Sequence, residues 1–97
     1  MGRQAELEKA FDAALAQIER LLRSGIETVE GASAQPKLEE LAKELKRERA
    51  NALARHSIDR DWLQRTVRSV VEWLPDTELT LVAALGAIVR AAPTPLS

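Results

Sequence analysis

The stretch TLVAALGAIV, residues 80–89, carries no charge in a chain that is 30% Asp, Glu, Lys and Arg. Projected at about 100° per residue, its large and small side chains separate onto opposite sides of a helix. The large side chains are Leu81, Val82, Leu85, Ile88 and Val89. The small ones opposite are Ala83, Ala84 and Ala87, and Ala91, just beyond the stretch, falls on the same side. A surface helix normally keeps one polar face. We therefore expect other helices to wrap this one on both sides.

Length and composition indicate one globular domain over residues 1–97. The chain is 45% hydrophobic and has a formal net charge of -1, which gives it no overall attraction to nucleic acid or to an anionic membrane. It has no cysteine and a single histidine. The sequence therefore predicts no disulfide, no thiolate nucleophile, no metal centre and no cofactor.

Neither a secretion signal nor a membrane span is predicted. The start, MGRQAELEK, lacks the apolar core of a signal peptide. The longest apolar run, residues 81–89, is far shorter than the ~20 residues that cross a bilayer. We expect a cytoplasmic protein that does not bind a membrane.

The first predicted helix covers residues 3–24. Its apolar stripe consists of Leu7, Phe11, Ala14, Leu15, Ile18, Leu21 and Leu22. The stripe continues beyond Gly25, so the helix either ends there with a glycine C-cap or continues to about residue 30. Residues 31–36, GASAQP, are the clearest loop in the sequence.

The second predicted helix, residues 36–56, has a polar interruption in its apolar stripe. Arg49 and His56 project onto the centre of that stripe and form a candidate polar site. They could bind an anion or supply a general base, because His titrates near neutral pH. In the commoner structural interpretation, Arg49 buries only its stem, and His56 is stabilised by the negative end of the helix dipole.

The third predicted helix, residues 59–74, has Asp59 as its N-cap and ends before Pro75. Its apolar and charged side chains separate cleanly onto two faces. Trp62 and Trp73 lie on the same side of this helix, next to the apolar face, and we expect both to be at least half buried.

The fourth predicted helix covers residues 77–91, with Asp76 or Thr77 as its cap, and residues 93–97 form a loose tail. The predicted fold is all-α: a four-helix, bundle-like domain in which a long N-terminal helical hairpin packs on two shorter C-terminal helices.

One alternative function is DNA binding, because residues 53–71 resemble a helix-turn-helix motif. That resemblance implies that the helix at residues 59–74 reads DNA through Arg60, Gln64, Arg65 and Arg68. The sequence departs from the motif at Ser57, where a glycine is common, and its carboxylates Asp59 and Asp61 would approach phosphates. A nucleic acid is therefore the less favoured partner.

No enzyme family supplies a complete site. The basic residues and one Glu across the first two helices resemble those of helical chorismate mutases, but the fixed spacing of that family is missing, so no catalytic residue is assigned. The residues concerned are Arg20, Arg23, Lys37, Glu48 and Arg49. His56 resembles the phosphoacceptor of histidine phosphotransfer domains, without the Lys and Gly that usually follow it. We expect no enzymatic activity.

The favoured function is protein–protein interaction, as an adaptor, a scaffold or a regulatory subunit that self-associates into a homodimer. The expected interface combines the small face of the fourth helix with the two tryptophans: Ala83, Gly86, Ala87, Ala91, Trp62 and Trp73. In the alternative arrangement, the first helix covers the small face within one chain, with Phe11 and Ile18 filling the space.

Overall fold

The computed structural model describes residues 2–55, 58–75 and 77–91 of the 97-residue chain. Its elements are α1 (Gly2–Ser24), α2 (Gln35–Arg55), α3 (Arg60–Trp73) and α4 (Leu79–Ala91). The described residues contain no β-strand, and the predicted all-α fold with four helices is confirmed.

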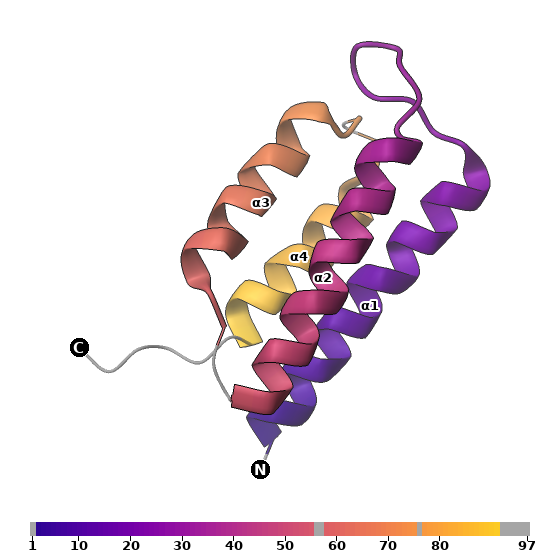
Figure 1. Ribbon diagram of the computed structural model, residues 1–97. Coiled ribbons are helices and arrows are strands. Elements are labelled where there is room, and N and C mark those ends of the chain that lie inside the picture. Colours follow the sequence, from indigo (N-terminus) through magenta and orange to yellow (C-terminus); the bar gives the residue numbers. More distant parts are fainter. Residues whose placement is uncertain (1, 56–57, 76, 92–97) are drawn as a thin grey trace.

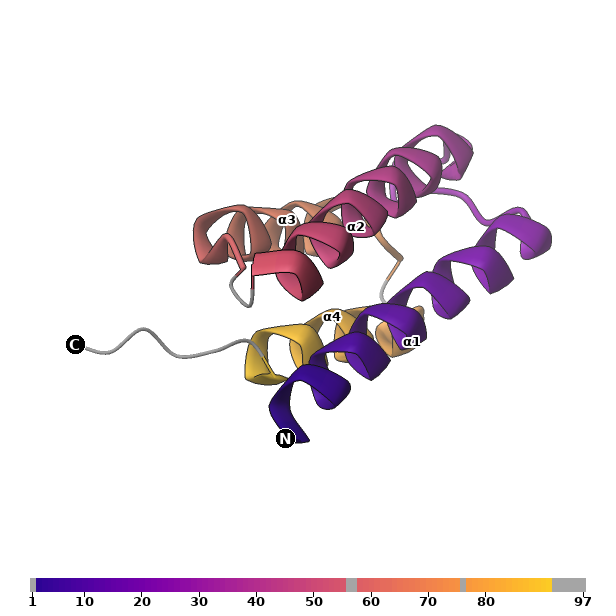
Figure 2. The same ribbon diagram turned by 60° about the horizontal axis from the view of Figure 1, so that its bottom comes forward.

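The four helices form two layers, with α1 and α4 in one layer and α2 and α3 in the other (Figures 1 and 2). α1 packs against both α2 and α4, and α3 packs against α4. Across the described residues, no Cα atom of α2 lies within 8 Å of a Cα atom of α3. The bundle is therefore closed along three edges and open along the fourth, between α2 and α3.

One hydrophobic core joins all four helices. Its fully buried large side chains are Phe11, Ile18 and Leu21 of α1, Leu38 and Leu45 of α2, Leu63 and Val70 of α3, and Leu81, Leu85 and Ile88 of α4. The apolar stretch at residues 80–89 thus has α1 and α3 on two of its sides. Two of its positions, Thr80 and Ala83, are exposed.

The connection between α1 and α2 is an ordered turn. α1 ends at Ser24, and Gly25 follows with a φ of 68°. Of the two predicted ends of the first helix, at Gly25 or at about residue 30, the structure therefore has the earlier one. Glu27 and Ser33 then form an antiparallel bridge. The backbone N–H of Val29 donates to the carbonyl O of Trp73 at 3.0 Å, which ties this turn to the end of α3.

Side chains cap the starts of α2 and α3. The hydroxyl of Ser33 accepts from the backbone N–H of Gln35 at 3.3 Å, and Pro36 occupies the first turn, where its missing N–H costs nothing. Asp59 Oδ1 accepts from the backbone N–H of Trp62 at 3.0 Å, which confirms Asp59 as the N-cap of α3.

The prediction for the start of the fourth helix was wrong. The helix begins at Leu79, not at residue 77. The N–H of Glu78 donates to the carbonyl O of Pro75 at 2.9 Å, so this residue is bonded backwards along the chain before the helix begins. Thr77 lies two residues before the first residue of the helix and does not cap it. Asp76, the other candidate cap, and residues 93–97 lie outside the described residues.

Two glycine substitutions should change stability in opposite directions. Gly25→Ala should destabilise the fold by about 1 kcal/mol, because the left-handed φ of 68° strains any side chain although no atom lies near the new Cβ. Gly86→Ala should stabilise it by about 0.5 kcal/mol, because alanine is the better helix former and the new Cβ would meet only the tip of Arg90, at 3.5 Å. Urea unfolding followed by circular dichroism measures both changes. A Gly25→Ala variant as stable as the wild type would contradict the conformation assigned to Gly25.

Candidate functional site

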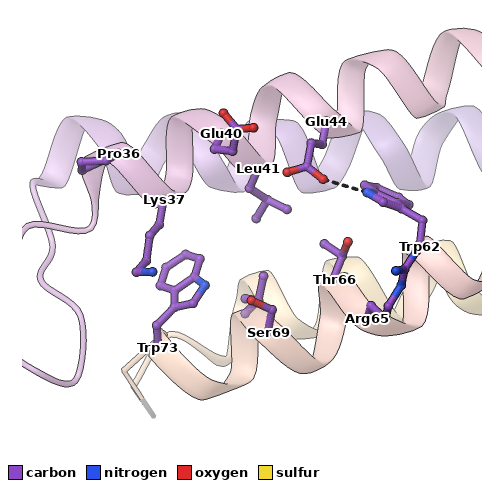
Figure 3. A pocket seen from close by; sticks show the side chains of 11 residues that line it. Pro36, Lys37, Glu40, Leu41, Glu44, Trp62, Arg65, Thr66, Ser69 and Trp73 are labelled. Carbon is purple, nitrogen blue, oxygen red and sulfur yellow. Dashed lines mark hydrogen bonds between the residues drawn. The ribbon is translucent and has the colours of Figure 1, made fainter.

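The open edge of the bundle forms a groove of about 540 Å³ between α2 and α3. The side chains that line this α2–α3 groove come from both helices (Figure 3). They are Pro36, Lys37, Glu40, Leu41 and Glu44 on the α2 side, and Trp62, Arg65, Thr66, Ser69, Val70 and Trp73 on the α3 side. Its volume lies in the range of natural ligand pockets.

Both tryptophans of the chain face this groove, one toward each of its ends (Figure 3). Trp62 is only 8% exposed, and Trp73 is partly buried, so the prediction that both are at least half buried is confirmed. Trp62 Nε1 donates to Glu44 Oε1 at 2.8 Å. At the other end, Lys37 Nζ lies 5.9 Å from the centroid of a Trp73 ring, within the range of a cation–π contact.

Between these two cross-links the groove has an apolar floor and polar walls. Leu41 and Val70 are buried and form the floor. Thr66 and Ser69 extend from α3 toward α2 (Figure 3), and Glu40 lies exposed on the α2 side. In the described part of the chain, none of these three polar side chains has a hydrogen-bond or ion-pair partner. The groove therefore offers apolar contact together with unused acceptors.

Arg49, one half of the predicted polar site, lies away from the groove. Its Nη2 is 3.0 Å from Glu8 Oε1 and its Nε is 3.0 Å from Asp12 Oδ1, so the side chain joins α2 to α1. The Arg49 side chain is 29% exposed, and its Nε and Nη2 each donate to a carboxylate of α1. His56 lies outside the described residues. The contacts of Arg49 are those of a structural link between two helices.

The candidate DNA contacts lie on the outer side of α3. Gln64, Arg65 and Arg68 are exposed and surround a shallow hollow that also contains Asp61. Arg60 at the start of the helix is partly buried. α2 and α3 run antiparallel (Figures 1 and 2), whereas the helices of a helix-turn-helix motif cross at about 90–120°. Nothing in this arrangement favours a nucleic acid.

The small face of α4 is partly covered by α1. Ala87 and Ala91 line a hollow beside Ala10 of α1, and Gly86 is also partly buried. Phe11 and Ile18 of α1 are fully buried, although Ala83 remains exposed. Part of the small face therefore packs against α1, and the rest, which includes Ala83, forms a narrow exposed strip.

A second hollow lies between α3 and α4. It is lined by Val67, Val71 and Val89, with Gln64, Arg68 and Glu72 around it. Val71 is 53% exposed. This hollow is similar in volume to the α2–α3 groove, at about 600 Å³, but it contains no aromatic side chain and no cross-link between its walls. We therefore take the α2–α3 groove as the candidate site.

Comparison of the chain with known protein families, curated proteins and solved structures gives no match. Among the described residues, no group of three or more His, Cys, Asp and Glu side chains could hold a metal ion. In the same residues, no helix is both long and apolar enough to cross a membrane. We therefore infer a function from the properties of the groove itself.

The α2 wall of the groove was not predicted from the sequence. Glu40 and Glu44 are one helical turn apart beside the apolar stripe, and such a pair normally belongs to a solvated helix face. The available signal was Trp62, whose indole N–H needs an acceptor when the ring is buried. That requirement predicts a polar side chain opposite Trp62, but the sequence does not say on which helix.

A double-mutant cycle should detect the hydrogen bond between Trp62 and Glu44. We expect Trp62→Phe and Glu44→Ala to show a coupling energy of about 1 kcal/mol in unfolding experiments, because the bond has a charged acceptor but is partly solvated. In the matched control, Glu40→Ala replaces Glu44→Ala, and the effects should add. Additive effects in both cycles would show that the bond does not stabilise the fold.

Proposed function

We propose that this domain is a protein–protein interaction module, an adaptor, scaffold or regulatory subunit, that binds a helical segment of its partner in the α2–α3 groove. One observation carries the proposal: α2 and α3 share a layer of the bundle but leave between them a groove with two tryptophans. Tryptophan is enriched among the residues that contribute most to protein–protein binding.

The dimensions of the groove suit a helix. Its cross-links start from Lys37 and Glu44 of α2, so they are separated by seven residues, or about 10 Å along the helix axis. That length equals about two turns of a partner helix, which would present side chains at i, i+3 or i+4, and i+7. Leu41 and Val70 supply the apolar floor for those side chains.

The groove is also held in shape before any partner binds. One wall is fixed to α1 through Arg49, and the end of α3 is fixed to the α1–α2 turn through Val29. Binding to a preformed groove avoids the cost of ordering flexible segments. This rigidity supports a recognition role for the groove.

Self-association through α4 is a second proposal, which a different observation favours. Leu79 at the start of α4 is 67% exposed, and Ala83 lies one turn further along the same outer strip. Within the described part of this helix, Arg90 is the only charged side chain. A second copy could cover this strip across a two-fold axis.

Groove binding can be tested with a displayed library of amphipathic helical peptides. Peptides selected on the wild-type domain should bind Thr66→Trp at least ~10-fold more weakly, because a large side chain at this position fills the groove. Gln64→Trp is the matched control, since Gln64 is exposed on α3 outside the groove. Fluorescence anisotropy of labelled peptides gives the affinities. A library without binders, or binders that tolerate Thr66→Trp, would contradict the proposal.

Dimerisation can be tested by light scattering on the wild type and on Ala83→Arg. We expect a dimer that becomes a folded monomer, because Ala83 is exposed and an arginine there does not disturb the core. Ala83 is a better position for this test than Ala87, because Ala87 lies against α1 and its substitution would also disturb packing within the chain. A monomeric wild type would refute the dimer.

A further inference from the structure

We infer that a second copy of this chain covers the outer face of α3 and α4, across a two-fold axis that pairs Arg68 of each copy with Glu72 of the other. This inference rests on the proposed self-association through α4, and it extends that interface to α3. It follows from the place where exposed apolar side chains gather and from two charges that have no partner among the described residues.

Exposed apolar side chains gather on the outer face of α3 and α4. Among the described residues three large apolar side chains are exposed, and two of them, Val71 of α3 and Leu79 of α4, belong to these helices. Val71 lines the hollow between the two helices together with Val67 and Val89. A concentration of exposed apolar surface on a small domain is typical of an interaction site.

The α3–α4 hollow and the outer strip of α4 form one continuous surface. Residues three or four apart are neighbours on a helix, and Leu79, Val82, Gly86 and Val89 follow one another at these spacings. The last three are only partly buried, so each leaves some surface for a partner. A second copy that covers Leu79 and Ala83 therefore reaches the hollow without crossing a charged side chain.

Two charged side chains at the edge of the hollow lack a partner. Arg68 and Glu72 are exposed, line the hollow, and have no hydrogen-bond or ion-pair partner in the described part of the chain. They are four residues apart, but the basic residue comes first, which is the weaker order for an ion pair on one helix. Glu72 also lies at the end of α3, where the helix dipole disfavours a negative charge and the last turn has no basic side chain. A cation from another molecule would stabilise it.

A second copy of the chain supplies both missing charges at once. A two-fold axis that crosses α3 at right angles, midway between Arg68 and Glu72, makes the helix antiparallel to its copy. Each arginine then faces the glutamate of the other copy, which is the reciprocal contact of an isologous interface. Val71 lies one residue from this midpoint, so the two copies of this exposed valine meet beside the axis. The surface is therefore complementary to itself in both charge and apolar character.

Charge reversal tests the pairing. In sedimentation equilibrium we expect a wild-type dimer, and dimers at least ~10-fold weaker for Arg68→Glu and for Glu72→Arg, because each variant replaces two attractive contacts with two repulsive ones. An equimolar mixture of the two variants should associate again, since both pairs are complementary in the mixed dimer. Both positions are exposed, so both variants should fold, which circular dichroism checks.

Lys43→Glu is the matched control for Arg68→Glu. It changes the net charge of the chain by the same amount, but Lys43 is exposed on α2 and does not line the α3–α4 hollow. The dimer of this variant should be as strong as that of the wild type.

The outcomes separate this inference from the proposed self-association. A monomeric wild type would contradict both. A dimer that Ala83→Arg disrupts and both charge reversals leave intact would confine the second copy to α4 and overturn the extension to α3. Reversal variants that stay monomeric when mixed would show that Arg68 and Glu72 do not pair with each other. An equally large effect of Lys43→Glu would indicate general charge repulsion and would also overturn the pairing.

Discussion

The open edge of this bundle depends on the two indole side chains that stand between α2 and α3. Packed helices normally approach to 8–10 Å between their axes, but Trp62 and Trp73 occupy the space through which α3 would move toward α2. Each ring is also held by a polar group of α2, Trp62 by Glu44 and Trp73 by Lys37. The tryptophans therefore act both as spacers and as cross-links, and the groove is what lies between them.

The layer formed by α1 and α4 holds α2 and α3 in place although these two helices stay apart. α1 packs against α2 and α4, and α4 packs against α3, so both walls of the groove stand on one continuous core. The links from Arg49 to α1 and from Val29 to the end of α3 fix each wall separately. Because neither wall needs the other for its position, the groove can exist without an occupant.

The sequence predicted what depends on local spacing. Helical periodicity and the Asp59 cap gave the number and approximate limits of the helices. The α2–α3 groove could not be predicted, because periodicity shows which side of a helix is buried but not which neighbour covers it. Glu40 and Glu44 are typical of a solvated face until Trp62 is placed opposite them. The sequence also did not predict that α4 begins only at Leu79. The N–H of Glu78 donates to the carbonyl O of Pro75, and this hydrogen bond stands where the predicted helix would already have begun.

The separation of α2 from α3 can be measured most directly by disulfide trapping, since the chain has no native cysteine. A disulfide needs Cα atoms about 4.4–6.8 Å apart, and no Cα pair between these helices is within 8 Å among the described residues. Cysteines at Glu40 and Ser69 should therefore stay reduced under mild oxidation and be joined only by a longer bifunctional reagent. Cysteines at Glu27 and Ser33, which form a bridge pair, should oxidise readily and serve as the control. Rapid formation of a disulfide between the Glu40 and Ser69 positions would mean that α2 and α3 close on each other, and would contradict the open groove.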